Sequence, residues 1–442
     1  MQWPRFSNFG AMPWGVPVSN EPTPTERLYA IVEQGLCIGC GLCQSIAGSD
    51  RIRVSKTVTG YLQPVVRGEL DHATVDRIYA ACPGTRVEGL PERLLEADTK
   101  KDNVWGPWRR MVRGWAGDPE VRFEGSTGGV LTALGVYLLE SKRVDFILQV
   151  KTSATEPSFG EPVLSFTGAE VFEAAGSRYG PAAPLLDINE VLDRRQPFAF
   201  IAKPCDISAL RNYARQDARV DELVRYWLTM VCGGYGTPQG TIEFYKRVGI
   251  DPGEVTALRY RGRGCPGPTR VETTSGAREF HYIDYWGEDE TTWTLPFRCK
   301  ICPDGIGESA DIAAADTWIG GSPNRVDSVD DPGVNALIAR TRAGEELIAA
   351  AAKDGALMLD YDTVPDTLSV YQPHQVNKKY AAWARHQGLA DSGRIVPQTE
   401  RLRIRQLADE LPAAAIRFQR EGTRQRVEAG KASEPTPQAL KP

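Results

Sequence analysis

Hydrophobic and polar residues follow two different periods along the middle of the chain. Apolar residues recur at helical spacing over residues 130–140, and the run at 144–150 has the length and apolar content typical of a strand. Further strands are predicted at 198–202 and 226–231, followed by helices at 207–215 and 239–248. Strands that alternate with helices predict an α/β body with a largely parallel or mixed sheet.

The pattern changes at both ends of the chain. The first residues are rich in Pro, Ser, Asn and Trp without periodicity, residues 378–386 and 400–421 have helical spacing, and the polar residues 422–442 are expected to be disordered. A polar linker is expected at 96–103. The predicted division is an extended arm at 1–25, a compact module at 26–95, two α/β parts at 104–200 and 201–375, and a helical extension with a disordered tail at 376–442.

Composition narrows the class of protein. The net charge of −5 over 442 residues gives no basic excess for binding nucleic acid. The longest apolar stretches, at 130–139 and 348–357, are too short to cross a membrane, and the first residues lack the regions of a signal peptide. We therefore expect a cytoplasmic protein that binds neither nucleic acid nor membrane.

The nine cysteines are too few for a disulfide scaffold in a chain of this length. None of the four histidines lies within a few residues of a cysteine, which disfavours mixed Cys/His zinc sites. Ligation of zinc or iron by sulfur alone therefore remains.

One cysteine group predicts an iron–sulfur cluster from its spacing. Cys37, Cys40 and Cys43 are each separated by two residues, so successive thiolates can reach different iron atoms of one 4Fe–4S cube. The fourth ligand of a bacterial ferredoxin would fall at Ala47, but Cys82, which a proline follows, offers a ferredoxin-like ending. These four cysteines are predicted to hold one 4Fe–4S cluster. A zinc ribbon is the alternative, and it fits the two-residue gaps less well.

Two further cysteines follow predicted strands. Cys205 comes after the strand at 198–202, and Cys232 comes after the strand at 226–231. Ligands of open α/β sheets bind at the carboxyl ends of strands, so these thiols can share a site with the CxxC pair Cys299 and Cys302. On position alone, Cys205 and Cys232 can equally be small buried hydrophobic residues.

Several motifs together resemble a known family. Besides the CxxCxxC segment, they are Gly125-Ser-Thr-Gly-Gly129, Ser177-Arg-Tyr-Gly-Pro181, Lys203-Pro-Cys205, Val231-Cys232, Arg259-Tyr-Arg-Gly262, Cys299-x-x-Cys302-Pro-Asp304, Ala310-Asp311-Ile312 and Asp316-Thr-Trp318. In this order, over about residues 30–330, the chain resembles the β subunits of coenzyme F420-dependent hydrogenases and dehydrogenases. That group also includes ferredoxin-dependent reductases such as the 7-hydroxymethyl chlorophyll a reductase.

The resemblance implies an iron–sulfur flavoprotein with two 4Fe–4S clusters and FAD. It implies Cys205, Cys232, Cys299 and Cys302 as ligands of the second cluster. The glycine-rich loop before the helix at 130–140 is a weak pattern alone. The resemblance implies that it binds the flavin, and its N–H groups suit a phosphate. Arg178 would pair with phosphate or the reduced ring, or else be a solvated surface residue. The implied flavin contacts are Ser126, Thr127, Gly128, Gly129, Ser177, Arg178, Tyr179 and Lys203.

The expected fold class is therefore α+β or α/β. It consists of a ferredoxin-like 4Fe–4S module at 26–95, an α/β body with a flavin-binding part at 104–200 and a second-cluster part at 201–375, and a helical C-terminal extension. No G-x-G-x-x-G fingerprint with a following acidic residue is present, so we do not expect classical NAD binding.

These parts predict an oxidoreductase. Clusters carry one electron at a time and flavin carries one or two, so electrons would pass between ferredoxin or a partner subunit, the clusters and FAD. Hydride exchange at flavin N5 would involve a small organic substrate or coenzyme F420, and no side chain is assigned a catalytic role. The alternative is a non-catalytic electron-transfer subunit of a larger complex. The arm and the C-terminal helices would then serve as docking or oligomer contacts.

Three features have more than one interpretation. Cys265 is either a buried residue or a replacement for a ligand such as Cys232. The nearby basic loop either meets an acidic substrate or ferredoxin, or is a solvated turn; it contains Arg259, Arg261, Arg263 and Arg270. The acidic positions after the last CxxC are expected to hold loops around the cluster, and they are Asp304, Asp311 and Asp316.

Overall fold

The computed structural model describes residues 21–288, 292–326 and 331–440. Its centre is a sheet of eight strands: β6 (Arg110–Ala116), β7 (Phe146–Thr152), β8 (Gly160–Ser165), β9 (Phe198–Ala202), β10 (Val224–Met230), β14 (Ile312–Asp316), β15 (Asn335–Ala339) and β16 (Leu357–Asp362). The strand order is β16-β6-β15-β14-β10-β9-β7-β8. The pairs β7/β9, β9/β10 and β10/β14 are parallel and the other pairs are antiparallel, so the sheet is mixed.

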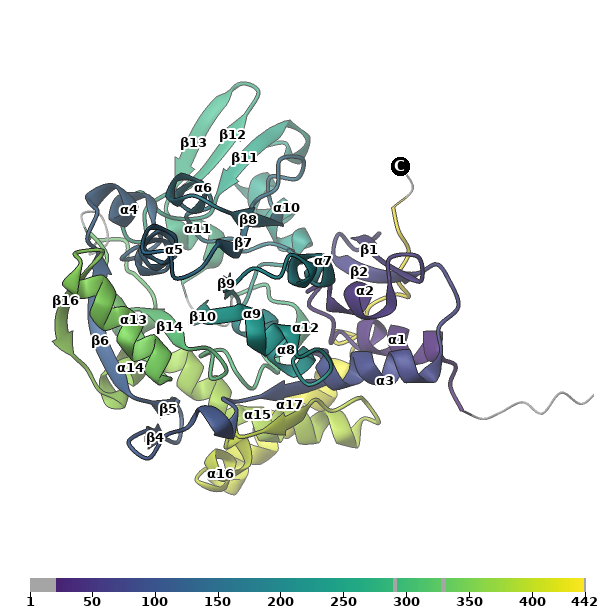
Figure 1. The fold of residues 1–442 in the computed structure, drawn as a ribbon. Helices are drawn as coiled ribbons and strands as arrows, with labels where there is room; N and C mark the ends of the chain where they lie inside the picture. The colour runs from purple at the N-terminus through teal and green to yellow at the C-terminus, as the bar shows by residue number, and fades with distance from the viewer. Residues whose placement is uncertain (1–20, 289–291, 327–330, 441–442) are drawn as a thin grey trace, which may run out of the picture.

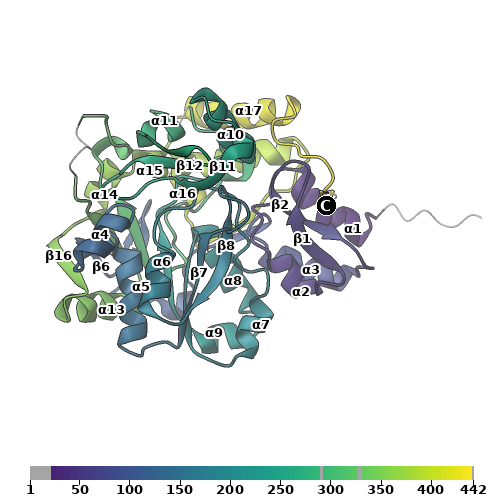
Figure 2. The ribbon, with the colours of Figure 1, turned by 90° about the horizontal axis from the view of Figure 1, so that it is seen from above.

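Helices cover both faces of this sheet (Figures 1 and 2). One face carries α4 (Pro119–Glu124), α5 (Val130–Glu140), α6 (Gly168–Glu173) and α13 (Arg342–Lys353), and the other carries α7 (Ile188–Asp193), α8 (Pro204–Tyr213), α9 (Arg219–Leu223), α14 (Pro365–Tyr371) and α15 (Pro373–Asp391). Strand β9 shows why the sheet is buried on both faces. Phe198 and Phe200 pack with α8, whereas Ala199 and Ile201 pack with α5, because successive side chains of a strand point to opposite faces.

The N-terminal part packs directly against the body. It consists of α1 (Pro24–Glu33), α2 (Leu42–Ala47), β1 (Ile52–Lys56), β2 (Leu62–Val66), α3 (His72–Ala81), β3 (Arg86–Glu88) and the 3-10 turn η1 (Glu92–Leu94). Leu36, Leu42 and Ile52 belong to the same buried cluster as Phe200 and Leu210 of the body. This shared core joins the module to the face of the sheet that carries α8.

The remaining elements surround this core, with α16 and α17 packed against α15. They are β4 (Lys100–Asp102), β5 (Gly106–Trp108), α10 (Pro238–Arg247), η2 (Pro252–Glu254), β11 (Val255–Arg259), β12 (Thr269–Thr273), β13 (Gly276–Phe280), α11 (Tyr282–Trp286), α12 (Phe297–Lys300), η3 (Ile319–Gly321), β17 (Gln398–Glu400), α16 (Ile404–Asp409) and α17 (Ala413–Glu428). Strands β11, β12 and β13 form a small antiparallel sheet that projects from the body (Figure 1).

Several predicted elements have the expected type and close to the expected bounds. The helix at 130–140 and the strand at 198–202 coincide with α5 and β9. The boundary expected at residue 200 falls inside β9, so the two predicted α/β parts share one sheet. Of the predicted arm at 1–25, residues 1–20 lie outside the described residues, and α1 begins at Pro24.

The C-terminal prediction was wrong in two respects. The single helix expected at 400–421 is divided into β17, α16 and α17, because Arg403 adopts a positive φ of 56° and Pro412 precedes α17. The tail expected to be disordered from 422 continues α17 to Glu428 and then runs as an extended segment to Leu440.

The C-terminal segment, residues 432–440, lies along the N-terminal part (Figures 1 and 2). Glu434 N–H donates to the carbonyl oxygen of Glu33 at 3.0 Å, and Leu440 N–H donates to that of Lys56 at 3.1 Å. Thr57 and Ala439 form an isolated antiparallel bridge. Backbone hydrogen bonds to the end of α1 and to β1 therefore order a segment whose composition alone suggests disorder.

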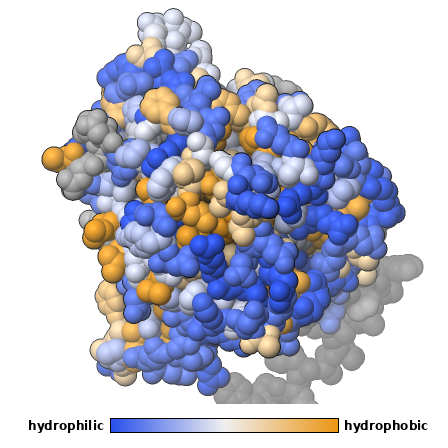
Figure 3. All heavy atoms as spheres, turned by 60° about the vertical axis from the view of Figure 1, so that its left-hand side comes forward, coloured by the Kyte–Doolittle hydropathy of each residue, from blue (hydrophilic) through white to orange (hydrophobic). Residues whose placement is uncertain are grey.

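The side of the molecule where β16 lies is mostly hydrophilic, with hydrophobic side chains gathered in a central hollow (Figure 3). Within the described ranges, no helix is both long enough and apolar enough to cross a membrane.

Glu434 links the stability of the C-terminal segment to pH. The side chain accepts a hydrogen bond from Gln63, yet burial raises its pKa from 4.5 to about 7. The folded protein therefore holds this proton more tightly than the unfolded chain. The stabilisation is complete below pH 4.5 and is lost as the pH rises to 7.

We expect Glu434→Gln, whose side chain is neutral at every pH, to be more stable than the wild type at high pH. The predicted gain in the free energy of unfolding is about 1–2 kcal/mol well above the folded pKa, with little difference near pH 5. Urea unfolding at both pH values measures it, with the exposed Glu173→Gln as the control. An equal effect at both pH values would contradict this assignment.

Candidate functional site

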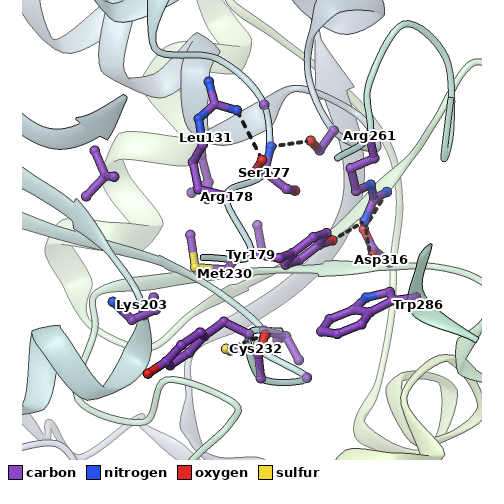
Figure 4. Close-up of a pocket in the computed structure, with 18 of the residues that line it drawn as sticks. Leu131, Ser177, Arg178, Tyr179, Lys203, Met230, Cys232, Arg261, Trp286 and Asp316 are labelled. Atoms are coloured by element: carbon purple, nitrogen blue, oxygen red, sulfur yellow. Dashed lines mark hydrogen bonds and ion pairs between the residues drawn. The ribbon is translucent and has the colours of Figure 1, made fainter. Parts of the chain in front are cut away.

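A cavity of about 240 Å³ lies at the carboxyl ends of β9, β10 and β14 (Figure 4). Lys203 follows β9, Cys232 follows β10 and Asp316 ends β14, and all three line the cavity. The carboxyl ends of parallel strands are the usual ligand-binding edge of an open α/β sheet. The sheet topology therefore opens this cavity where a cofactor or substrate is expected.

The glycine-rich loop forms one wall of the cavity. Gly129 has a φ of 71°, and a Cβ atom there would lie 2.6 Å from the carbonyl oxygen of Val121, so only glycine fits. Gly128 N–H donates to Asn335 Oδ1 at 3.0 Å, which ties the loop to β15. Ser126 and Gly129 line the cavity, whereas Thr127 and Gly128 are not among its lining residues. The loop thus contributes two of its four predicted contacts to the wall.

The second predicted flavin segment lies beside this loop. Ser177 N–H donates to Ser126 Oγ at 2.8 Å. Ser177, Arg178 and Tyr179 all line the cavity, and so does Lys203. The structure therefore brings six of the eight predicted flavin contacts to one cavity.

Arg178 has the surroundings of an anion-binding residue. Its Nη1 and Nη2 donate to the carbonyl oxygens of Ser177 and Ala175 at 3.0 and 3.1 Å, while its enclosed Nε has no hydrogen-bond partner. Among the described residues no carboxylate pairs with it. Burial, together with the charge of Arg259, lowers its pKa to about 10. A phosphate group in the cavity would supply both the missing negative charge and a hydrogen-bond acceptor. The residues present therefore fit an anionic cofactor.

Lys203 is held by a carboxylate at the base of the cavity. Its Nζ lies 2.6 Å from Asp206 Oδ2. Burial favours the neutral amine, but the charges of Asp206 and Cys205 raise the pKa of Lys203. The ammonium group is therefore retained beside the thiols of Cys205 and Cys232.

The four cysteines of the second set come together next to this cavity. Cys205 lies in the first turn of α8, Cys232 follows β10, and Cys299 and Cys302 lie at α12. Burial raises the pKa of Cys205 well above its usual value, with further contributions from the charges of Asp206, Cys232 and Cys302. Burial and the charge of Cys299 raise the pKa of Cys232 to about 12. Cys205, Cys232 and Cys299 are thus each close enough to another cysteine of the set for its charge to raise their pKa.

Cys265 lies apart from that set. It is 2% exposed, and the charged groups that influence its pKa are Arg261, Asp316 and Asp331. Its neighbour Gly333 packs against Thr127, behind the glycine-rich loop. This position favours the buried interpretation of Cys265 and not a replacement for Cys232.

The first cysteine set surrounds a second, smaller cavity. Cys37, Cys40 and Cys43 approach it from the loop before α2 and from its first turn, and Cys82 approaches it from the end of α3. The other lining residues are almost all apolar; they are Leu28, Ile31, Val32, Ile38, Gly39, Gly41, Leu42, Ile46, Val54, Pro64 and Ile78.

The backbone at this cavity allows several thiols to approach one another closely. Gly39 and Gly41 have positive φ values of 73° and 91°, and a Cβ atom on Gly39 would lie 2.6 Å from the carbonyl oxygen of Leu62. Gly84 N–H donates to Cys82 Sγ at 3.4 Å. The two glycines permit the turns between thiols, and N–H groups that point at sulfur are the hydrogen bonds cluster sites use.

Burial and mutual repulsion keep the first set of thiols protonated. Burial raises the pKa of Cys37 and Cys40 well above the usual value, with Cys82 adding to both, and raises the pKa of Cys43 to about 12. In the part of the chain that the structure describes, no three Cys, His, Asp or Glu side chains are arranged around a single metal ion. The sulfur atoms instead line a space, and the donor set of four thiols in an apolar cavity fits an iron–sulfur cube.

The sequence reasoning missed an aromatic wall that extends from Tyr179 of the second flavin segment. Tyr179 and Trp286 lie 4.9 Å apart between ring centroids, and Trp286 stacks on Trp293 at 5.6 Å and 21°. Trp293 in turn meets His374 edge-on at 5.3 Å, and all four rings line the cavity. The clustering of aromatic residues between positions 282 and 293 was the available signal. Such a wall suits a flat conjugated ring.

A buried ion pair supports the same wall. Arg261, which is 2% exposed, donates to Asp316 Oδ2 at 2.9 Å and to Thr127 Oγ1 at 2.6 Å. Its guanidinium also lies 4.6 Å from the ring centre of Trp318. Thr127 therefore acts behind the loop as a support for Arg261, which explains its absence from the cavity lining.

The predicted basic loop is neutralised in the structure. Arg259 and Arg263 both pair with Glu124, Arg261 pairs with Asp316, and Arg270 pairs with Glu272 and Glu279. These ion pairs do not favour a loop that attracts an acidic partner.

The acidic positions after the last CxxC have structural contacts. Asp311 accepts hydrogen bonds from Trp227 N–H and from Thr341 Oγ1, both at 2.9 Å, and Asp304 accepts from Glu308 N–H at 3.0 Å. They hold the chain between α12 and β14, whereas Asp316 also lines the cavity.

Comparison with known families gives two matches that follow each other along the chain. Residues 111–189 match the model for the N-terminal part of the coenzyme F420 hydrogenase/dehydrogenase beta subunit. Residues 196–363 match the model for the C terminus of the same beta subunit. Together they cover the glycine-rich loop, the second cysteine set and the aromatic wall except His374, but not the first cysteine set.

Two curated proteins are similar over much of the chain. The F420-dependent formate dehydrogenase 1 subunit beta of Methanococcus maripaludis is 26% identical over 245 residues, which are 54% of this chain and 58% of that protein. The coenzyme F420 hydrogenase subunit beta of Methanococcus voltae is 22% identical over 291 residues, 62% of this chain and 92% of that protein. The match thus spans less than two thirds of the formate dehydrogenase subunit.

A solved structure has a similar fold. A chain of the F420-reducing NiFe hydrogenase complex from Methanosarcina barkeri superposes with a TM-score of 0.50 at 20% identity, covering 63% of this chain and 92% of that chain. At this identity the likeness concerns the fold.

Proposed function

The chain belongs to the coenzyme F420 hydrogenase/dehydrogenase beta subunit family, and from this premise we propose that it is an iron–sulfur flavoprotein oxidoreductase. It would pass electrons between ferredoxin or a partner subunit, two 4Fe–4S clusters and FAD, and exchange hydride with coenzyme F420 or another small organic compound. The observation that carries the proposal is that Cys232 lines the same cavity as Ser177 and Arg178. A cysteine of the second set is thus within the wall of the proposed flavin site.

The residues divide into three roles. The first cluster would be held by Cys37, Cys40, Cys43 and Cys82, the second by Cys205, Cys232, Cys299 and Cys302, and FAD by Ser126, Gly129, Ser177, Arg178, Tyr179 and Lys203, with Thr127 and Gly128 supporting the loop from behind. When bound, the clusters supply one-electron transfer and FAD supplies the exchange between one-electron and two-electron chemistry.

The side chains of the cavity bind and orient, and none is assigned to proton transfer. Arg178, which no carboxylate among the described residues pairs, would offer its positive charge to a phosphate, and Lys203, held by Asp206, places an ammonium group beside the cysteines of the second set. Burial lowers the pKa of His374 to about 4, with Lys378 adding to the effect, so the imidazole is neutral at physiological pH. Tyr179, Trp286 and Trp293 provide a face on which a flat hydride partner can stack.

The iron content of cysteine variants tests the cluster assignment. We expect about eight irons per anaerobically reconstituted chain, because two four-iron cubes require them. Cys82→Ala should lose about half of the iron, because it removes a thiol from the first set only. Cys265→Ala, the matched control, should keep all of it. Loss of iron in the Cys265 variant, or none in the Cys82 variant, would show that the ligand sets are wrong.

The affinity for FAD tests the role of Arg178. Removing a charged hydrogen bond to phosphate costs about 1.5–3 kcal/mol, so Arg178→Gln should weaken FAD binding by about 10–100-fold. Arg263→Gln removes the same charge from a neighbouring loop outside the cavity lining and should leave affinity unchanged. Quenching of FAD fluorescence on titration with the apoflavoprotein measures both. Equal affinity of the Arg178 variant and the wild type would remove Arg178 from the flavin site.

Turnover separates the enzyme from a non-catalytic subunit. We expect the reconstituted chain, reduced anaerobically with dithionite or ferredoxin, to bleach oxidised coenzyme F420. Trp286→Leu should raise the KM for F420 by about 2–10-fold while the iron and flavin contents stay unchanged, because one stacking surface is lost. Reduction of clusters and flavin without any reaction with F420 would reject F420 as the hydride partner. If no organic acceptor reacts either, the chain transfers electrons only within a larger complex.

A further inference from the structure

A buried cation lies between the two cysteine sets. Arg298 belongs to α12, directly before Cys299, and its side chain is 1% exposed. Nε and Nη2 donate to the carbonyl oxygen of Pro83 at 3.0 and 2.6 Å. Pro83 follows Cys82 of the first set. One side chain therefore starts beside the second set and ends beside the first.

The charged groups that face Arg298 are cysteines. Within residues 21–288, 292–326 and 331–440, no carboxylate forms an ion pair with it. Burial favours loss of its proton, but Cys302, Cys205 and Cys299 together raise the pKa of Arg298. On the other side, burial raises the pKa of Cys82, while the N–H of Gly84 and the charge of Arg298 act against that rise. Both cysteine sets thus interact with the same guanidinium.

Another charged residue near both sets is already neutralised. Asp206 influences both Cys40 and Cys205, but its carboxylate is paired with Lys203 at 2.6 Å. His386 packs nearby with its Nε2 at 3.1 Å from the carbonyl oxygen of Ile301, and burial lowers its pKa to about 4, so it is neutral. Among the described residues no carboxylate pairs with Lys378 either, but this lysine acts on Cys232 and Cys299 of the second set, whereas Arg298 acts on cysteines of both sets. Arg298 is therefore a buried charge that the two sets share and that no carboxylate balances.

An unpaired buried guanidinium is costly, since several kcal/mol of hydration are lost when a charge leaves water. Thiolate-bound clusters carry negative charge, which grows by one unit when a cluster accepts an electron. A positive charge nearby stabilises the reduced form more than the oxidised form, and it therefore raises the reduction potential. Arg298 stays protonated throughout, so this effect moves no proton.

Resting on the proposed function, we propose that Arg298 is a positioning residue shared by both cluster sites. It ties the segment of Cys299 and Cys302 to the Cys82–Pro83 ending, and it raises the reduction potentials of both clusters together. Because one charge shifts both potentials in the same direction, it changes the driving force for electron transfer between the clusters less than it changes either potential.

Redox titration of three full-length variants tests the proposal. Arg298→Gln removes the charge, Arg298→Lys keeps it but loses the two-point contact with Pro83, and Lys300→Gln removes an exposed charge from the same helix. Iron and sulfide content is measured first, and the midpoint potential of each cluster is then followed by electron paramagnetic resonance. We expect both potentials to become more negative in Arg298→Gln, and to remain near the wild-type values in Arg298→Lys and Lys300→Gln.

The other possible results each test one part of the proposal. A loaded Arg298→Gln protein with unchanged potentials, or with only one potential changed, would overturn the shared role. If Arg298→Gln fails to hold its clusters while Arg298→Lys holds both, the requirement for the charge is supported. If Arg298→Lys also fails to hold them, the charge is not what matters and the proposal is wrong. A wild-type chain without two clusters would refute the proposed function itself, which the iron analysis shows before any titration.

Discussion

Eight thiols enclosed in a protein interior impose the constraint around which this fold is built. A buried thiolate is strongly disfavoured, and burial raises the pKa of Cys37, Cys40 and Cys205 well above the usual value. Such thiols stay protonated unless a metal takes the place of the proton. Under the proposed function, the apolar walls, the glycine turns and the guanidinium of Arg298 would all serve metal sites of this kind. The shared core between the N-terminal part and α8 then holds the two sites side by side.

Features that depend on neighbouring residues could be predicted from the sequence. The spacing of Cys37, Cys40 and Cys43 is local, and it indicated the cavity that these residues line with Cys82. Five consecutive apolar residues identified β9, because a strand buried on both faces needs no polar alternation. The glycine-rich loop was recognisable as a turn into α5, and Gly129 does adopt the positive φ that such a turn requires. These elements need only local information.

Features that depend on contacts between distant segments could not be predicted. Arg298 meets Pro83 across 215 residues, and Trp293 meets His374 from another part of the chain, so no sequence window contains either pair. Thr127 was expected in the flavin wall, but the ion pair of Arg261 and Asp316 draws it behind the loop. At the C-terminus, helical periodicity continued across Pro412 and hid a break that proline marks. The composition of the last residues indicated disorder because the hydrogen bonds to β1 are invisible in it.

The C-terminal segment also sets an order of events during biosynthesis. Ala432 packs against Gly35, and Glu434 lies close enough to Cys37 to influence its pKa, so residues 432–440 lie beside the first cysteine set. The ribosome synthesises the CxxCxxC loop long before it synthesises these residues. Until residues 432–440 dock, this side of the loop has no cover, and a cofactor of the proposed kind would have easier access to the cysteines then than afterwards.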